Sequence, residues 1–155
     1  MCVHGVLRER FKVHKLVKVD TSAIIEKLNP VLETQKEVVG AYLFGSILGR
    51  CRPDSDIDVG LLLNPYVFHS EREAERITEE ILEALPAFNH HPFDFIILNR
   101  SSAIFAYKVI TQGQLIYACR LDAVTDFMET VSRQRTEDYP RYREALEAIV
   151  KGKRI

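Results

Sequence analysis

The chain has 155 residues, 46% of them hydrophobic and 28% charged, a balance typical of one globular domain. The 21 Lys and Arg residues against 22 Asp and Glu residues disfavour generic nucleic-acid binding, which usually needs a basic excess. No apolar run approaches the roughly 18 residues of a membrane span, and we expect no secretory signal. Three cysteines without CxxC spacing indicate a cytoplasmic protein with neither disulfides nor a zinc site.

Residues 1–20 are basic and weakly alternating, and we expect an N-terminal extension that contains an edge strand. A single domain is expected over residues 21–155. Apolar residues at helical spacing predict a helix over 21–35. The Asn29-Pro30 step is expected to kink or restart this helix, because proline disfavours a helical conformation in the residue before it.

Four segments with a high content of strand-forming residues follow. The nearly continuous apolar runs 38–44 and 57–63 predict two buried strands, and the interval between them is too short for a crossover helix. These two strands should therefore be antiparallel. Residues 93–98 predict a third buried strand, and 114–117 predict a fourth, short one.

Helices are predicted between and after these strands. A capping box at 70–73 begins a helix that runs to about Leu85 and ends before Pro86. A serine, either Ser101 or Ser102, caps a short helix after the third strand. Helices packed on a small mixed sheet define an α+β fold.

Two amphipathic helices separated by Pro140 are predicted to finish the chain. Their apolar faces can either pack on the back of the sheet or dock a partner protein or a second copy of the chain. The residues of these faces are Val124, Phe127, Val131, Tyr142 and Leu146.

Polar residues accompany three of the apolar strands. Gly45-Ser46 follows the first strand, Asp56 and Asp58 begin the second, and Asp94 lies within the third. Residues i and i+2 of a strand share a face, so Asp56 and Asp58 should project side by side. Carboxylates rarely enter buried strands unless something compensates their charge, and we expect the three acids to meet.

Three adjacent carboxylates repel one another, and divalent cations such as Mg²⁺ reverse this repulsion. The set suits a two-metal site for displacement at phosphorus. Gly45-Ser46 allows close approach to a phosphate, and residues 47–49 are expected to form a short helix whose N–H groups favour an anion. The alternative is a turn over 53–56 whose Asp side chains cap backbone N–H groups, but it leaves Asp58 and Asp94 unexplained.

Three weaker signals have simple structural explanations. His90 and His91 precede a proline in a loop, and we interpret them as solvated residues rather than metal ligands. Arg133 and Arg135 are expected on a solvated helix face. Cys51 is interpreted as a passive thiol.

The run from Leu43 through Gly45-Ser46, followed after nine residues by Asp56-Ile57-Asp58-Val59, resembles the signature of the polymerase-β-like nucleotidyltransferase superfamily. Asp94 lies where this superfamily has its third carboxylate. The short chain resembles the minimal nucleotidyltransferase (MNT) branch. The pattern over 105–117 looks like that of antitoxins of HEPN/MNT toxin–antitoxin pairs.

This resemblance implies an ATP- and Mg²⁺-dependent enzyme that transfers AMP to a tyrosine of a HEPN ribonuclease toxin, silences it and forms a hetero-oligomer with it. It implies that Asp56 and Asp58 bind two Mg²⁺ ions, and that Asp94 ligates the catalytic ion and activates the attacking hydroxyl. Gly45 and Ser46 would hold the phosphates of the leaving pyrophosphate.

Other possibilities remain open at this stage. The arginine that often follows Gly-Ser in the family is missing, and Arg50 or Arg52 is the expected substitute. One alternative function is nucleotidyl transfer to a small molecule such as an aminoglycoside. Another is an antitoxin that acts by binding alone.

Overall fold

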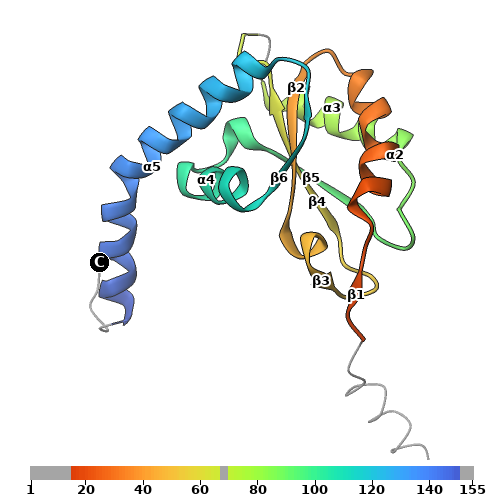
Figure 1. Ribbon diagram of the computed structural model, residues 1–155. Coiled ribbons are helices and arrows are strands. Elements are labelled where there is room, and N and C mark those ends of the chain that lie inside the picture. The colour runs from red at the N-terminus through yellow and green to blue at the C-terminus, as the bar shows by residue number, and fades with distance from the viewer. Residues whose placement is uncertain (1–14, 67–69, 151–155) are drawn as a thin grey trace, which may run out of the picture.

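A four-stranded mixed sheet forms the centre of the computed structural model, which describes residues 15–66 and 70–150 (Figure 1). The strands lie in the spatial order β5-β4-β2-β6. Strand β2 is antiparallel to β4 and to β6, as predicted for the first pair, whereas β4 and β5 are parallel. The strands are β2 (Val38–Phe44), β4 (Ile57–Leu63), β5 (Phe93–Ile97) and β6 (Gln114–Ala118).

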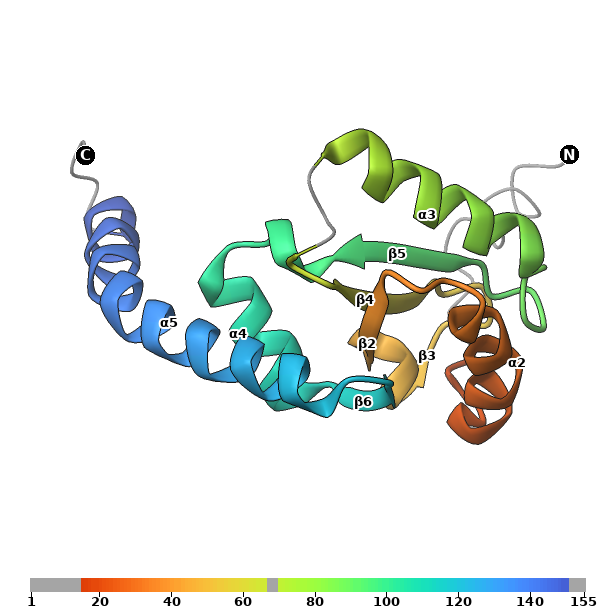
Figure 2. The ribbon, with the colours of Figure 1, turned by 90° about the horizontal axis from the view of Figure 1, so that it is seen from above.

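Two helices cover each face of the sheet (Figure 2). One face packs against α2 (Thr21–Glu33) and α3 (Glu71–Ala84). The other face packs against α4 (Ala103–Gln112) and α5 (Leu121–Val150). This arrangement confirms the α+β fold with a small mixed sheet flanked by helices.

Alternation along β4 decides which side chains reach each face. Ile57, Val59 and Leu61 are fully buried in the core beneath α2 and α3. Leu62 belongs to the second core cluster, beneath α4 and α5, and Asp58 shares its face because it is an even number of residues away. The side chain of Asp58 therefore projects toward the side of α4 and α5.

Side-chain caps fix where the helices begin. The Ser70 hydroxyl accepts from the Glu73 backbone N–H at 3.3 Å, which confirms the predicted start of α3. Of the two candidate serines before α4, Ser102 is the cap and accepts from the Phe105 N–H at 3.2 Å. The Asp20 carboxylate caps α2 in the same way.

Neither helical proline breaks its helix. Pro30 lies inside α2, and Pro140 lies inside α5, which is a continuous helix of 30 residues. The predicted separation into two final helices is therefore wrong. A proline removes only one backbone hydrogen bond, and Pro140 and Thr136 are exposed, so water can reach the carbonyl that loses its partner.

The first half of α5 packs on the sheet, and the second half projects away from it (Figures 1 and 2). Val124 is 0% exposed and Phe127 packs partly buried against the same core cluster, so packing on the back of the sheet accounts for these two residues of the predicted apolar face. Val131 is also buried, with 3% of its surface exposed. The side chains of Tyr142 and Leu146 lie outside the described set. No helix in the described ranges is long and apolar enough to cross a membrane.

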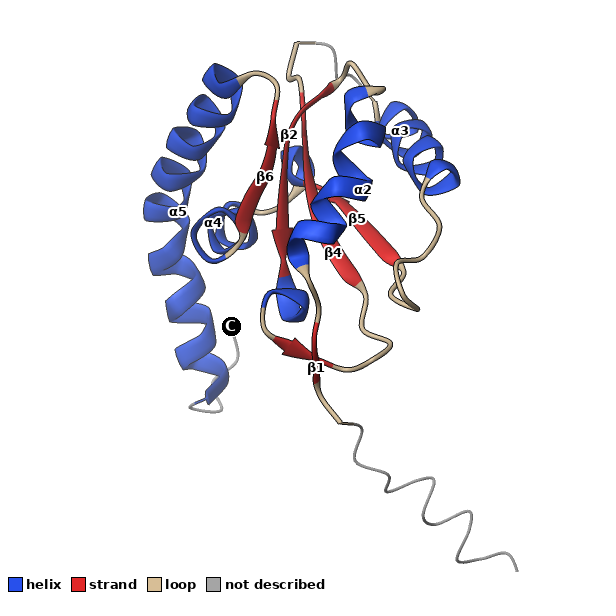
Figure 3. Cartoon of the chain, turned by 45° about the vertical axis from the view of Figure 1, so that its right-hand side comes forward, coloured by secondary structure: helices blue, strands red, loops and turns tan. Residues whose placement is uncertain are grey.

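A second, two-stranded sheet lies below the main one (Figure 3). Strand β1 (Val17–Lys18) pairs antiparallel with β3 (Arg50–Cys51), so the extension contributes an edge strand here. The rest of the extension, residues 1–14, lies outside the described residues. Cys51 is a free and buried thiol.

Candidate active site

Asp58 and Asp94 occupy paired positions on the parallel strands β4 and β5. Paired residues of adjacent strands project on the same side, so both carboxylates face the side of α4 and α5. Asp58 is half-buried, whereas Asp94 is exposed. The expectation that Asp94 lies in a buried strand is wrong, because β5 is the edge strand of the sheet.

Asp56 lies just before β4 and is exposed. Its negative charge nevertheless reaches Asp58. Burial raises the pKa of the Asp58 carboxyl above its usual value, and the charges of Asp94 and Asp56 raise it further. Within the described ranges, no group of three His, Cys, Asp or Glu side chains forms a ready-made metal site.

The backbone of Gly45 lies directly against the Asp58 carboxylate. Its φ of +83° lies in the left-handed region, and a Cβ at this position would overlap the Asp58 carboxylate. The predicted helix at 47–49 is instead a single 3₁₀ turn, Gly45–Leu48. A helix dipole therefore contributes nothing to phosphate binding here, which leaves the close backbone and the exposed Ser46 hydroxyl.

A pocket of about 430 Å³ opens beside Gly45. A second pocket, of about 600 Å³, shares part of its wall and extends between α4 and α5. Pockets of these sizes match the range of small-molecule sites. The first pocket is lined by Phe44, Gly45, Leu48, Phe105, Lys108, Val109 and Gln112.

Lys108 is the residue that sequence reasoning missed. Among the described residues it is the one cation that lines the pocket beside Gly45, and it lies on α4 between Phe105 and Gln112. The three residues share one helix face because they are three and four residues apart. This spacing was readable from the sequence, but nothing local linked α4 to Gly45, which the fold brings close.

The two arginines expected to contact phosphate lie elsewhere. Arg52 forms an exposed ion pair with Asp54 at 3.3 Å, and Arg50 lies on β3. Neither lines the pocket beside Gly45.

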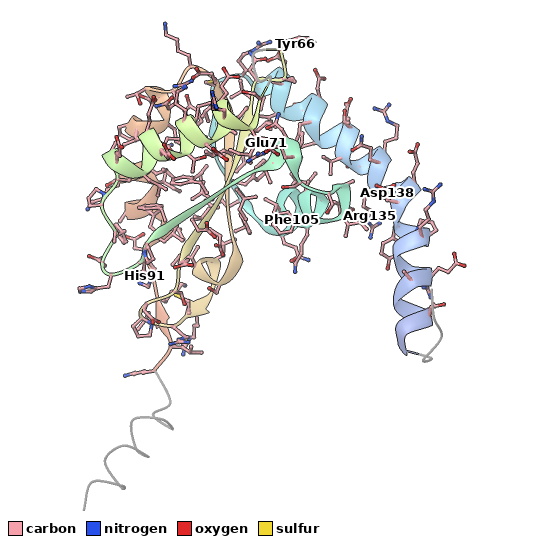
Figure 4. The ribbon with its side chains drawn as sticks, turned by 180° about the vertical axis from the view of Figure 1, so that it is seen from behind. Tyr66, Glu71, His91, Phe105, Arg135 and Asp138 are labelled. Atoms are coloured by element: carbon pink, nitrogen blue, oxygen red, sulfur yellow. The ribbon has the colours of Figure 1, made fainter. Side chains whose placement is uncertain are left out.

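Two further expectations about exposed residues are each right for one residue and wrong for the other, and Arg133 is exposed as expected. His91, which is labelled in Figure 4, is buried, with 4% of its surface exposed. Its neighbour His90 is exposed as expected. Arg135 is stacked between the rings of Tyr107 and Tyr139, at 4.6 and 4.3 Å from the ring centroids. These contacts explain why Arg135 is half-buried rather than fully solvated.

Paired carboxylates beside a left-handed glycine, with a cation across a pocket, define a site suited to phosphoryl or nucleotidyl transfer. Residues 26–120 match the family described as "Polymerase beta, Nucleotidyltransferase", which covers more than half of the chain. The chain therefore belongs to this nucleotidyltransferase family. No curated protein matches it in sequence.

The fold is also that of chains in several solved toxin–antitoxin structures. A chain of a toxin–antitoxin structure with AMP-PNP has a TM-score of 0.61 and 20% identity, with 81% of this chain and 98% of that chain covered. A structure of a tri-AMPylated HEPN toxin with its MNT antitoxin, from Shewanella oneidensis, gives 0.59 and 19%, covering 84% and 99%. The MntA–HepT complex gives 0.55 and 19%, covering 84% and 97%.

Proposed function

We propose that this chain is an MNT-type antitoxin that transfers AMP from ATP to a tyrosine of a HEPN ribonuclease toxin and thereby neutralises it. The observation that carries the proposal is the pairing of Asp58 with Asp94 in register on β4 and β5, with Gly45 against Asp58. The chain's membership of a nucleotidyltransferase family gives this constellation its chemistry.

The similar structures support the partner and the transferred group. They are toxin–antitoxin complexes, one with an ATP analogue and one with an AMPylated toxin. This chain covers 97–99% of the three matched chains.

The acids of the site fit Mg²⁺. Burial and the charges of two other carboxylates raise the pKa of Asp58, which is the electrostatic situation that a divalent cation reverses. We assign Asp56 and Asp58 to two Mg²⁺ ions, and Asp94 to the catalytic one. When bound, these ions supply positive charge that stabilises the charge developing on the transferred phosphoryl group.

ATP is assigned to the pocket beside Gly45, with its β- and γ-phosphates at Gly45 and Ser46. Lys108 supplies the cation that lines this pocket. The tyrosine oxygen attacks the α-phosphorus, and the bond from that phosphorus to the bridging oxygen of the β-phosphate breaks. Pyrophosphate leaves with the bonding electrons, and Asp94 accepts the tyrosine proton.

The test is transfer of label from α-labelled ATP to a HEPN protein co-purified with this chain, with mass spectrometry of that protein. Asp58→Asn and Asp94→Asn are expected to reduce transfer at least about 100-fold, because each loses a ligand to the reacting centre. Asp54→Asn is the matched control, since Asp54 is an exposed acid of the same loop that pairs with Arg52. It should transfer at the wild-type rate.

Three outcomes would contradict the proposal. A wild-type chain that labels no protein but labels an aminoglycoside indicates the small-molecule function. Unchanged transfer by Asp58→Asn shows that the site is wrong. If the Asp56→Asn/Asp58→Asn double variant still rescues growth in cells that express the toxin, binding alone is sufficient.

A further inference from the structure

A tight turn precedes β5 and fixes the direction of His91. The backbone N–H of Phe88 donates to the His91 carbonyl at 2.9 Å, and the His91 N–H donates to the Phe88 carbonyl at 2.8 Å. The two residues between them, Asn89 and His90, both have positive φ, at 46° and 71°. This is the backbone pattern of a two-residue hairpin turn, which holds its flanking residues in one geometry.

The His91 side chain contacts the loop that carries the first catalytic acid. Its Nδ1 lies 2.7 Å from the Ser55 carbonyl oxygen. A carbonyl can only accept, so the Nδ1 carries the proton and donates. The His91 side chain is polar and buried, with 4% of its surface exposed, which makes this hydrogen bond costly to lose.

Pro92, which follows His91, makes a hydrogen bond to the residue on the other side of Asp56. The Ile57 backbone N–H donates to the Pro92 carbonyl at 2.8 Å. Asp56 itself is exposed and lies outside the strands, so its backbone is fixed by its two neighbours. Both neighbours are held by the consecutive residues His91 and Pro92.

The same short segment also carries the third acid. Asp94 follows Pro92 by two residues and pairs in register with Asp58. The segment 91–94 therefore sets the position of Asp56, through the loop, and of Asp94, through the strand. Neither contact requires His91 to touch a substrate.

We infer that His91 is a positioning residue that fixes Asp56 relative to Asp58 and Asp94 through its hydrogen bond to Ser55. This inference rests on the proposed function for its role in metal binding and AMP transfer. Partners that orient a ligand from outside the metal's own shell typically change metal affinity by about 10–100-fold when they are removed.

The test compares two variants of the full chain. His91→Leu fills the site and removes the donor, whereas His91→Asn keeps an N–H at the place of Nδ1. The metal probe is Mn²⁺ alone, titrated by electron paramagnetic resonance. Hydrogen exchange of the Ile57 amide reports the loop directly. His90→Asn is the matched control, because asparagine tolerates a positive φ and His90 is exposed.

His91→Leu is expected to weaken Mn²⁺ binding about 10-fold and to speed exchange at Ile57, while the other β4 amides keep their protection. His91→Asn should restore both values to within about twofold, and His90→Asn should match the wild type. The inference is overturned if His91→Leu leaves both readouts unchanged, if the Leu and Asn variants lose affinity equally, or if exchange rises across the whole sheet.

These outcomes separate the inference from the proposed function. A wild type that binds Mn²⁺, loses it on His91→Leu and yet labels no toxin supports the inference and overturns the AMP-transfer proposal. A wild type that binds no Mn²⁺ overturns the metal assignment, and exchange at Ile57 then decides whether His91 holds the loop.

Discussion

Gly45 lies so close to Asp58 that a Cβ on Gly45 would occupy the space of the Asp58 carboxylate oxygen. The glycine also has a φ of +83°, a conformation that residues with a side chain rarely adopt. Gly45 directly follows β2, whose last residue, Phe44, pairs with Asp58 on the neighbouring strand β4. Glycine is therefore required at position 45 for two reasons: the Asp58 carboxylate leaves no room for a Cβ, and the turn needs a positive φ.

Gly45→Ala is predicted to abolish AMP transfer and to lower the free energy of unfolding by at least about 1 kcal/mol. The cost comes from the left-handed backbone and from displacement of Asp58. Gly49→Ala is the control, because a Cβ at Gly49 meets nothing within 4 Å. Urea unfolding and label transfer measure the two effects, and equal behaviour of the two variants would contradict the prediction.

Asp58→Asn is predicted to be more stable than the wild type at neutral pH when no divalent cation is present. The pKa of Asp58 is raised above 3.8 by burial, by Asp94 and by Asp56. Between about 3.8 and the raised pKa, the folded chain binds more protons than the unfolded chain, so stability falls as pH rises through this window. Below the window both states are protonated and the cost is absent.

Urea unfolding in EDTA from about pH 4 to pH 7 tests this sign. The wild type should lose stability relative to Asp58→Asn as pH rises, and added Mg²⁺ should stabilise the wild type more than the variant. If the wild type instead becomes more stable relative to Asp58→Asn as pH rises over this range, then the fold does not disfavour the charged form of Asp58.

Tyr42→Phe is predicted to leave the free energy of unfolding unchanged or to raise it by up to about 1 kcal/mol. Tyr42 is 2% exposed, and its hydroxyl has no hydrogen-bond partner among the described residues. Burial also raises the pKa of this phenol. Phenylalanine keeps the ring that packs with Val109 and Val124 and removes the unpaired oxygen.

The control for this prediction is Tyr42→Leu, which loses the ring and should destabilise the chain by about 1–3 kcal/mol. Thermal or urea unfolding separates the two. A large loss of stability in the Phe variant would reveal a partner for the hydroxyl.

Lys108→Gln is predicted to raise the KM for ATP about 10-fold with a smaller change in kcat, because Lys108 lines the pocket to which we assign ATP. Lys108→Arg should retain most of the affinity. The charge-matched control is Lys27→Gln, since Lys27 stacks on Phe88 rather than lining this pocket. If both glutamine variants behave alike, Lys108 does not contact the nucleotide.

Most of the fold was predictable because its signals are local. Apolar runs located β2 and β4, and Ser70 located the start of α3. The continuity of α5 was not predictable from Pro140, because a single lost hydrogen bond is tolerated in an exposed stretch of helix. Whether a proline ends a helix depends on solvent access and on the flanking turns.

The site was predictable in its residue types and less so in its surroundings. The sequence predicted Asp94 together with Gly45, Asp56 and Asp58, and the register of β4 with β5 pairs Asp94 with Asp58. The burial of His91 and the place of Lys108 depend on contacts between segments that are distant in sequence. No local pattern records such contacts.

The parallel pairing of β4 with β5 affects when Asp58 and Asp94 come together during folding. Parallel neighbours cannot be joined by a tight turn, and the chain runs through α3 between Asp58 and Asp94. The two acids therefore meet only after this long crossover has closed. A newly synthesised chain therefore brings Asp58 and Asp94 together only once β5 has been made and has paired with β4.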